Sequence, residues 1–304
     1  MKYGCLLMLS ICLLTVFGCN PETGKQVAVK GKIEIKGSDT EVNLVQRLAE
    51  SYMKTNPAVS ISVTGGGSGT GIAAIINGKT DIANSSRPMT EKELKQAQDK
   101  GVTAIAVVFA VDGLAIIVHD SIPVAELTIP QLGEIFKGTI ANWKELGGPD
   151  LAISLYGRQS NSGTYIYFRD TVVKGDYSAH MRNMNGTAQI VEAIKSDKAG
   201  IGYVGIGYVV NEQGKVTPGL KVLKLAKNKA DTFVSPTEAI NVKSGTYPLS
   251  RPLYQYLKGV PTGDLLAFVQ FELSETGQKI IEQEGFYAIS ESHLALARTL
   301  GIVK

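Results

Sequence analysis

The hydrophobic positions of this chain switch repeatedly between the spacing of a helix and that of a strand. From Glu41 the apolar residues recur at helical spacing until Asn56-Pro57, which ends the pattern. Val59, Ile61 and Val63 then alternate with serines, as they do in a strand that is buried on one face. The same analysis predicts further strands at 33–35, 81–83, 103–118, 151–155 and 200–204, and further helices at 72–76, 91–100, 128–137, 163–172, 187–195, 262–271 and 274–284.

This order of elements predicts an α/β fold with largely parallel sheets. In such sheets, ligands bind beyond the carboxyl ends of the strands, where the following helices begin. The chain after its leader has roughly 285 residues, more than one hydrophobic core usually serves. We therefore expect two lobes, with the site at the loops that join strands to helices.

The first 18 residues have the pattern of a signal peptide. Lys2 precedes an apolar run from Cys5 to Phe17 that is too short for a stable membrane span. Gly18 directly before Cys19 resembles the bacterial lipobox, after which the cysteine is lipid-modified and becomes the first mature residue. A simple secretory signal with an incidental cysteine is the alternative. We expect an extracytoplasmic protein, anchored to a bacterial membrane through lipidated Cys19 and a polar tether that extends to residue 31.

Composition argues against several other kinds of site. All three cysteines lie within the first 19 residues, so the mature fold has no thiol for a disulfide, a metal site or a nucleophile. Removal of the leader leaves 30 basic residues against 28 acidic ones, which gives no overall electrostatic case for nucleic acid. His119, His180 and His293 are scattered without the spacing of metal ligands. The sequence predicts neither a metal nor a cofactor.

Three loops rich in glycine and hydroxyl side chains each precede a predicted helix. They contain Gly37-Ser38-Asp39-Thr40, the glycine run 65–71 around Ser68, and Ser162-Gly163-Thr164. Each loop offers free backbone N–H groups and a small hydroxyl at the positive end of a helix dipole, a combination that holds anions. Arg158, four residues before Ser162, would add a charge-assisted contact. The three loops and the arginine together predict a pocket for a small tetrahedral oxyanion.

The same residues also have ordinary structural interpretations. Serine and threonine commonly cap helices, which applies to Ser38, Thr40 and the 162–164 loop, and Ser68 can be a turn residue. Arg87 is either a second ligand or the partner of a carboxylate on the rim of the cleft, and we expect the rim. A match to the dinucleotide motif G-x-G-x-x-G at 200–205 follows a helix and forms a strand itself, so we assign it no cofactor role.

Seven blocks of the sequence, taken in order, resemble the phosphate-binding proteins of bacterial phosphate ABC transporters. The blocks are GSDT, GGGSGTG, SSRPM, DGLAIIV, GRQSNSGTYIYF, GIGYV and YPLSRPLYQYLKG, and they cover essentially the whole mature chain. The resemblance implies a type II periplasmic-binding-protein fold, with two α/β lobes, two crossing segments and the ion in the cleft. It also implies a monomeric, non-enzymatic receptor that captures inorganic phosphate and delivers it to the membrane permease subunits of an ABC importer.

In that family the first loop, the serine of the glycine loop and the Arg-x-x-x-Ser-Gly-Thr set hold phosphate. With Ser86 and Asp112 added, the predicted phosphate-binding residues here are Ser38, Asp39, Thr40, Ser68, Ser86, Asp112, Arg158, Ser162, Gly163 and Thr164. Crossing points near Asp112-Gly113 and Tyr247-Pro248 predict a first lobe of 32–112 with 248–304 and a second lobe of 113–247.

One departure from the family pattern concerns selectivity. Many members have an aspartate in the loop after the third strand, which accepts a hydrogen bond from the phosphate's own proton, whereas here that loop is Asn84-Ser85-Ser86-Arg87. Such an acceptor separates phosphate, protonated near neutral pH, from fully deprotonated sulfate. Asp112, an acidic residue in an otherwise apolar strand, is our candidate replacement. The alternative is a hinge residue that caps local backbone groups.

Three other functions stay open at this point. The missing loop carboxylate favours a receptor for sulfate, molybdate or another oxyanion. A receptor of the same fold could instead signal phosphate status without feeding a transporter. A phosphatase or serine hydrolase would use Ser68 or Ser162, but no histidine lies near either residue in the sequence to act as a base.

Overall fold

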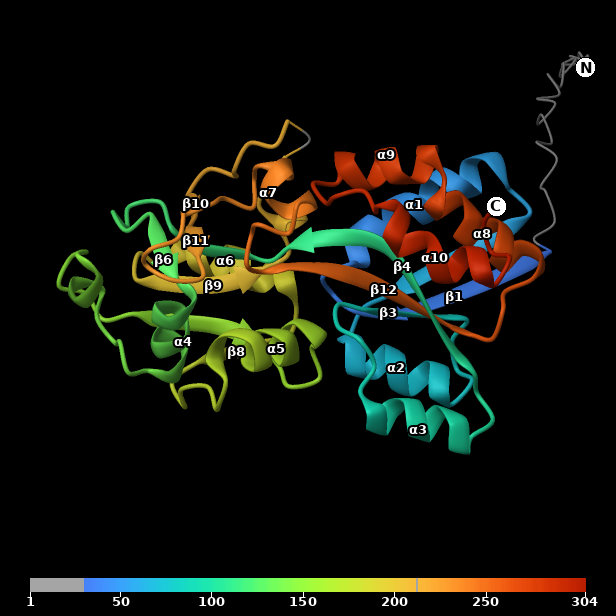
Figure 1. The fold of residues 1–304 in the computed structure, drawn as a ribbon, viewed down its shortest axis with the longest axis horizontal. Helices are drawn as coiled ribbons and strands as arrows, with labels where there is room; N and C mark the ends of the chain where they lie inside the picture. Colours follow the sequence, from blue (N-terminus) through green and yellow to red (C-terminus); the bar gives the residue numbers. More distant parts are fainter. Residues whose placement is uncertain (1–29, 212) are drawn as a thin grey trace, which may run out of the picture.

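The computed structural model describes residues 30–211 and 213–304. The predicted signal peptide, Cys19 and all but the end of the tether lie outside the described residues. Within them the chain forms two five-stranded sheets, each with helices packed on it, which stand beside one another and are connected by β4 and β12 (Figure 1).

The first sheet contains strands from both ends of the described chain. Its order is β2 (Val59–Thr64), β1 (Gly31–Gly37), β3 (Ile82–Ser85), β12 (Ser250–Lys258) and β4 (Ala104–Gly113). The first three strands are parallel, and β12 is antiparallel to both β3 and β4. One face carries α1 (Val42–Thr55), α8 (Gly263–Leu273), α9 (Glu275–Gln283) and α10 (Glu291–Thr299), and the other carries α2 (Ser68–Ile76) and α3 (Glu91–Asp99) (Figure 1).

The second sheet is formed by the middle of the chain. Its order is β10 (Leu220–Val222), β5 (Ala115–His119), β9 (Gly200–Val204), β7 (Ser154–Arg158) and β8 (Arg182–Met184). Around it lie α4 (Ile129–Lys137), α5 (Gly163–Phe168), α6 (Thr187–Ser196) and α7 (Ala239–Lys243), with a separate pair of strands, β6 (Glu126–Thr128) and β11 (Lys224–Ala226). The parallel βαβ arrangement of β7, α6 and β9 places the loop after Arg158 at a carboxyl edge.

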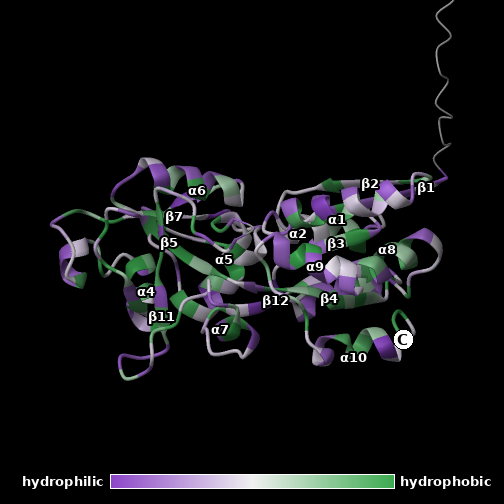
Figure 2. Cartoon of the chain, turned by 90° about the horizontal axis from the view of Figure 1, so that it is seen from above, coloured by the Kyte–Doolittle hydropathy of each residue, from purple (hydrophilic) through white to green (hydrophobic). Residues whose placement is uncertain are grey.

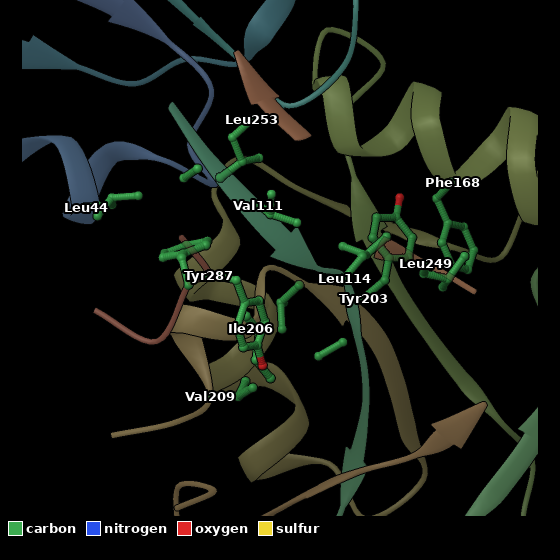
Figure 3. Packing of buried hydrophobic residues seen from close by; sticks show 14 of the residues in the cluster. Leu44, Val111, Leu114, Phe168, Tyr203, Ile206, Val209, Leu249, Leu253 and Tyr287 are labelled. Carbon is green, nitrogen blue, oxygen red and sulfur yellow. The ribbon is translucent and has the colours of Figure 1, made fainter. Parts of the chain in front are cut away.

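The two crossings lie against each other and continue the apolar core from one lobe to the other. The chain leaves the first sheet at Gly113 and enters the second at Ala115. Between them Leu114 N–H donates to the backbone oxygen of Leu249 at 3.0 Å, and the Tyr247 hydroxyl donates to the backbone oxygen of Leu114 at 2.8 Å. Figure 3 shows Leu114 and Leu249 within this buried packing. The lobe boundaries at 112 and 247 stay a prediction.

Two strand predictions need correction. The strand expected at 151–155 is Ser154–Arg158, because Leu151 instead accepts the Trp143 N–H at its backbone oxygen and donates its own N–H to Asn142 Oδ1. Strand β12 lies where no strand was predicted, and it contains a proline, a residue that central strands seldom hold. Pro252 pairs with Val111 of β4, in a part of β12 that extends beyond its pairing with β3, so the missing N–H breaks no bond to β3.

Polar and apolar residues separate between the outside and the inside of both lobes. In Figure 2 the central strands are largely hydrophobic, whereas exposed helix faces and loops are largely hydrophilic. No helix among the described residues combines the length and the hydrophobicity that crossing a membrane requires.

Candidate functional site

The predicted loops converge where the two lobes meet. Residues 38–41 follow β1, residues 65–67 follow β2, residues 86–90 follow β3, and residues 159–162 follow β7. The predicted hydroxyl side chains on these loops and in the first turns of α2 and α5 are all buried, at 0–2% exposure: Ser38, Thr40, Ser68, Ser86, Ser162 and Thr164. These six hydroxyl groups add polar atoms to the junction of the lobes without adding charge.

Four of these side chains, which we call the hydroxyl cluster, form a continuous hydrogen-bonded chain across the lobes. Thr40 Oγ1 lies 2.9 Å from Thr164 Oγ1, which lies 3.2 Å from Ser86 Oγ, and Ser86 Oγ lies 3.3 Å from Ser68 Oγ. Gly163 approaches the same point so closely that a Cβ atom there would lie 2.3 Å from Ser68 Oγ. Only glycine therefore fits at this position. The expected convergence of loops distant in sequence is present.

Ser162 combines a structural contact with its place in the site. Its Oγ accepts the Tyr165 N–H at 3.4 Å as the N-cap of α5, which is the ordinary interpretation considered above. A hydroxyl that accepts through a lone pair keeps its own proton for donation. The helix cap and a role in anion binding are therefore compatible.

Arg158 is buried and fixed by its neighbours. Nη1 donates to Thr187 Oγ1 at 2.9 Å, and Nη2 donates to the backbone oxygen of Asn185 at 3.0 Å and to the carboxylate of Asp39. Its Nε is buried and has no hydrogen-bond partner in the described protein. Because a buried N–H without an acceptor is costly, this N–H is available to an acceptor from outside the protein chain.

Asp39 connects three parts of the site. Its Oδ2 pairs with Arg158 of the other lobe, and its Oδ1 accepts the Gly66 N–H at 2.9 Å. Gly66 and Gly67 have φ angles of +113° and +89°, a conformation that favours glycine, so the backbone can turn toward this carboxylate. The Asp39 carboxylate thus balances the charge of Arg158 and fixes the glycine loop.

Asp112 is fully buried and paired with a residue that sequence analysis missed. Its Oδ2 accepts from Nε and Nη2 of Arg251 at 3.0 and 2.8 Å, and its Oδ1 accepts the Ile206 N–H at 3.1 Å. Burial raises the pKa of Asp112, and the adjacent guanidinium opposes that effect. Asp112 also lies close to Thr40, since a Cβ atom at Gly205 would lie 3.4 Å from Asp112 Oδ1 and 2.8 Å from Thr40 Cγ2.

Glu41 is a second buried carboxylate that sequence analysis did not single out. It is 0% exposed, and neither of its carboxylate oxygens has a hydrogen bond of good geometry. Burial raises its pKa well above the ordinary range, only partly opposed by the Ser38 side chain and by Arg251, while Asp112 raises it further. Burial therefore favours the uncharged, protonated form of Glu41. Glu41 directly follows the GSDT block, and this position was the feature of the sequence that could have identified it.

Arg87 has the role expected of a rim residue. Its Nη1 and Nη2 donate to the two carboxylate oxygens of Glu93 at 2.8 and 2.7 Å, and Nη1 also donates to the backbone oxygen of Pro88. The interpretation of Arg87 as the partner of a carboxylate is confirmed. Arg87 stabilises the loop before α3, and its terminal nitrogens are engaged there.

Comparison with known proteins supplies the family of this arrangement. A family model described as a PBP superfamily domain matches residues 23–276. The phosphate-binding protein PstS of Pseudomonas aeruginosa is 36% identical over 284 residues, covering 88% of this chain and 85% of that protein. PstS of Staphylococcus haemolyticus is 33% identical over 271 residues, covering 86% and 83%. A phosphate-bound putative phosphate ABC transporter substrate-binding protein from Clostridium perfringens matches with a TM-score of 0.75 and 29% identity, over 85% of this chain and 100% of that one.

Proposed function

This chain belongs to the PBP superfamily and, within it, to the PstS-type phosphate-binding proteins, and from that premise we propose that it captures inorganic phosphate outside the cytoplasm for an ABC importer. It has the mixed α/β, type II periplasmic-binding-protein fold of its structural neighbours. It is a binding protein and not an enzyme.

The observation that carries this proposal is the buried Arg158, whose Nε–H has no protein acceptor at the junction of four hydroxyl-bearing loops. A dehydrated tetrahedral anion needs fixed donors on several sides. Hydroxyl and backbone N–H groups supply them without excess charge, since Asp39 balances Arg158. The proposed phosphate-binding residues remain Ser38, Asp39, Thr40, Ser68, Ser86, Asp112, Arg158, Ser162, Gly163 and Thr164, with Asp39 acting through its backbone and through Arg158.

The arrangement of the lobes supports a way for the importer to recognise the phosphate-loaded receptor. The ion would contact loops of both lobes, so capture favours the closed form of the hinge, and the permease subunits would recognise that form. Lipid attached to Cys19 would keep the monomeric receptor at the membrane, within reach of those subunits. This anchoring rests on the lipobox-like Gly18-Cys19 sequence.

Calorimetric titration of the domain without its leader and tether tests the proposed function. We expect phosphate and arsenate to bind at one site per chain and sulfate not to bind, because sulfate has no proton to donate near neutral pH. Sulfate or molybdate binding more tightly than phosphate would replace phosphate with another oxyanion as the cargo. Failure of all four ions to bind would contradict the proposal.

Selectivity for the protonated ion is assigned to Asp112. Its Oδ1 accepts one backbone N–H and so retains a second lone pair that can accept a further hydrogen bond. In Asp112→Asn we expect phosphate affinity to fall by about tenfold or more and sulfate binding to become measurable, because an amide can donate where the carboxylate could only accept. The measurement is the same titration, on protein whose melting curve shows it to be folded. Unchanged phosphate affinity with unchanged rejection of sulfate would restrict Asp112 to its structural pairing with Arg251.

A further inference from the structure

Arg251 connects the crossing strands to the hydroxyl cluster. Nε and Nη2 donate to Asp112 Oδ2, Nη1 donates to the backbone oxygen of Ser86 at 3.1 Å, and Nη2 also donates to Thr164 Oγ1 at 3.1 Å. Arg251 is 3% exposed, so bulk water competes little for these bonds. A single side chain on β12 thus contacts a residue of β4, the loop after β3 in the first lobe and the loop after β7 in the second.

The position of this guanidinium is set by the fold. Arg251 is opposite Asp112 in the antiparallel register of β12 and β4, and its guanidinium carbon lies 4.9 Å from the ring centroid of Tyr167. An aromatic face and a carboxylate in register hold the plane of a guanidinium more firmly than either would alone. The two strands that carry the pair are the ones that cross between the lobes.

The bond from Arg251 determines what the Thr164 hydroxyl can do. A threonine hydroxyl has one proton to donate and two lone pairs that accept, whereas a guanidinium can only donate. Thr164 Oγ1 must therefore accept from Arg251, and its proton is directed elsewhere, toward the hydroxyls of Thr40 and Ser86 that lie within 3.2 Å. Arg251 leaves Thr164 as a donor at the place where the proposed ion needs one.

The charges around Arg251 are compatible with an anion nearby. Arg251 and Asp112 form a buried ion pair with no net charge. Glu41, the other carboxylate that acts on Arg251, would add a repulsive charge if it were ionised, and burial raises its pKa and so favours its uncharged form. Tyr208, which faces Asp39 and Glu41 from the second lobe, has its pKa raised by burial and is also neutral.

We propose that Arg251 is a second arginine of the anion site, a positioning residue that acts through Thr164 and does not itself contact the ion. The proposal rests on the proposed phosphate-binding function and adds a residue to it. Arg251 orients the Thr164 hydroxyl as a donor, holds the Ser86 loop by its backbone, and ties both to the crossing strands through Asp112.

A double-mutant cycle between Arg251 and Thr164 tests this proposal by calorimetric titration with inorganic phosphate. Lysine in Arg251→Lys keeps the charge beside Asp112 but cannot reproduce the planar set of donors, so we expect phosphate to bind about tenfold more weakly. Thr164→Val should weaken binding by a similar factor in the wild type. In the Arg251→Lys background, Thr164→Val should cost at least about fivefold less than it does in the wild type, because its hydroxyl is no longer oriented.

A control pair elsewhere in the protein separates this role from a purely structural one, and melting curves show which variants are folded. Arg182→Gln combined with Asp197→Asn removes an Arg–Asp pair of the second lobe that lies outside the loops of the site, and we expect it to leave phosphate affinity within about twofold. If Arg251→Lys does not fold, Arg251→Gln is made in the Asp112→Asn background, which removes both buried charges, and the cycle with Thr164→Val is measured against Asp112→Asn alone, because loss of Asp112 is itself expected to weaken binding. If the wild type binds phosphate but the losses of affinity in the Arg251 and Thr164 variants are strictly additive, the proposal is overturned and the proposed function stands. Absence of phosphate binding by the wild type would instead contradict the proposed function.

Discussion

Arg158→Met is expected to weaken phosphate binding by about 100-fold or more, the largest loss of affinity from any single substitution in this site. The substitution removes the buried Nε–H that lacks a protein acceptor, and with it the positive charge beside the ion. Hydrogen bonds to charged groups contribute roughly 1.5–3 kcal/mol each, and truncation of a buried charge adds the cost of the partner left behind. The measurement is the dissociation constant by calorimetry at fixed ionic strength.

Two further variants make the Arg158 result interpretable. Arg158→Lys keeps a positive charge for Asp39 but lacks the forked donors, so its affinity should lie between those of the wild type and Arg158→Met. Arg182→Met removes an arginine of the same lobe whose side chain is 61% exposed, and its phosphate affinity should stay within about twofold of the wild type. If Arg158→Met is folded and binds within threefold of the wild type, the assignment of this arginine is wrong.

Glu272→Gln is expected to raise the melting temperature by several degrees at pH 8, and to raise it progressively less as the pH falls toward 4.5. Glu272 lies on α8, is 0% exposed and accepts from Gln255 Nε2 at 3.0 Å, while its Oε2 has no partner. Burial raises the pKa of Glu272 to about 8. A glutamine keeps the acceptor for Gln255 and carries no charge to bury.

The direction of this pH dependence follows from the difference in the pKa of Glu272 between the folded and the unfolded chain. The unfolded chain releases this proton near the ordinary glutamate pKa, whereas the folded chain retains it until about pH 8. Between these values the unfolded state binds fewer protons, so stability falls as pH rises through that window and levels off above it. The raised pKa of Glu272 thus lowers the free energy of unfolding by on the order of 3 kcal/mol at pH 7.

Thermal melts of the wild type and of Glu272→Gln at intervals from pH 5 to pH 9 measure this difference. Glu91→Gln, an exposed glutamate in the first turn of α3, is the matched control and should follow the wild type at every pH. A stability difference between Glu272→Gln and the wild type that does not change with pH would show that Glu272 is not the titrating group.

The part of the site that was predictable from the sequence is the part made by local loops. Ser68, Gly163 and Thr164 lie in the first turn of α2 and α5, where glycine and hydroxyl residues have a recognisable pattern, and the structure brings all three together. Parallel strands bring the loops after them to a common edge, so short-range patterns were enough to predict convergence.

The residues that were missed depend on pairing between distant strands. Arg251 has its role because it lies opposite Asp112, and nothing in the sequence near either residue specifies that register. Strand β12 itself contains Pro252, which the sheet tolerates because β3 does not extend far enough to need its N–H. The raised pKa of Glu41 likewise results from burial, which the local sequence does not reveal.

The insertion of β12 between β3 and β4 has a consequence for the order in which the two lobes can fold. Every strand of the β5–β10 sheet is encoded before residue 223, so that sheet can assemble before the C-terminal part of the chain has been made. The other lobe cannot complete its sheet until residues 250–258 have emerged, and until then β3 and β4 present unpaired edges to neighbouring chains. A late segment of the polypeptide thus supplies both the strand that closes the first lobe and the arginine that joins it to the second.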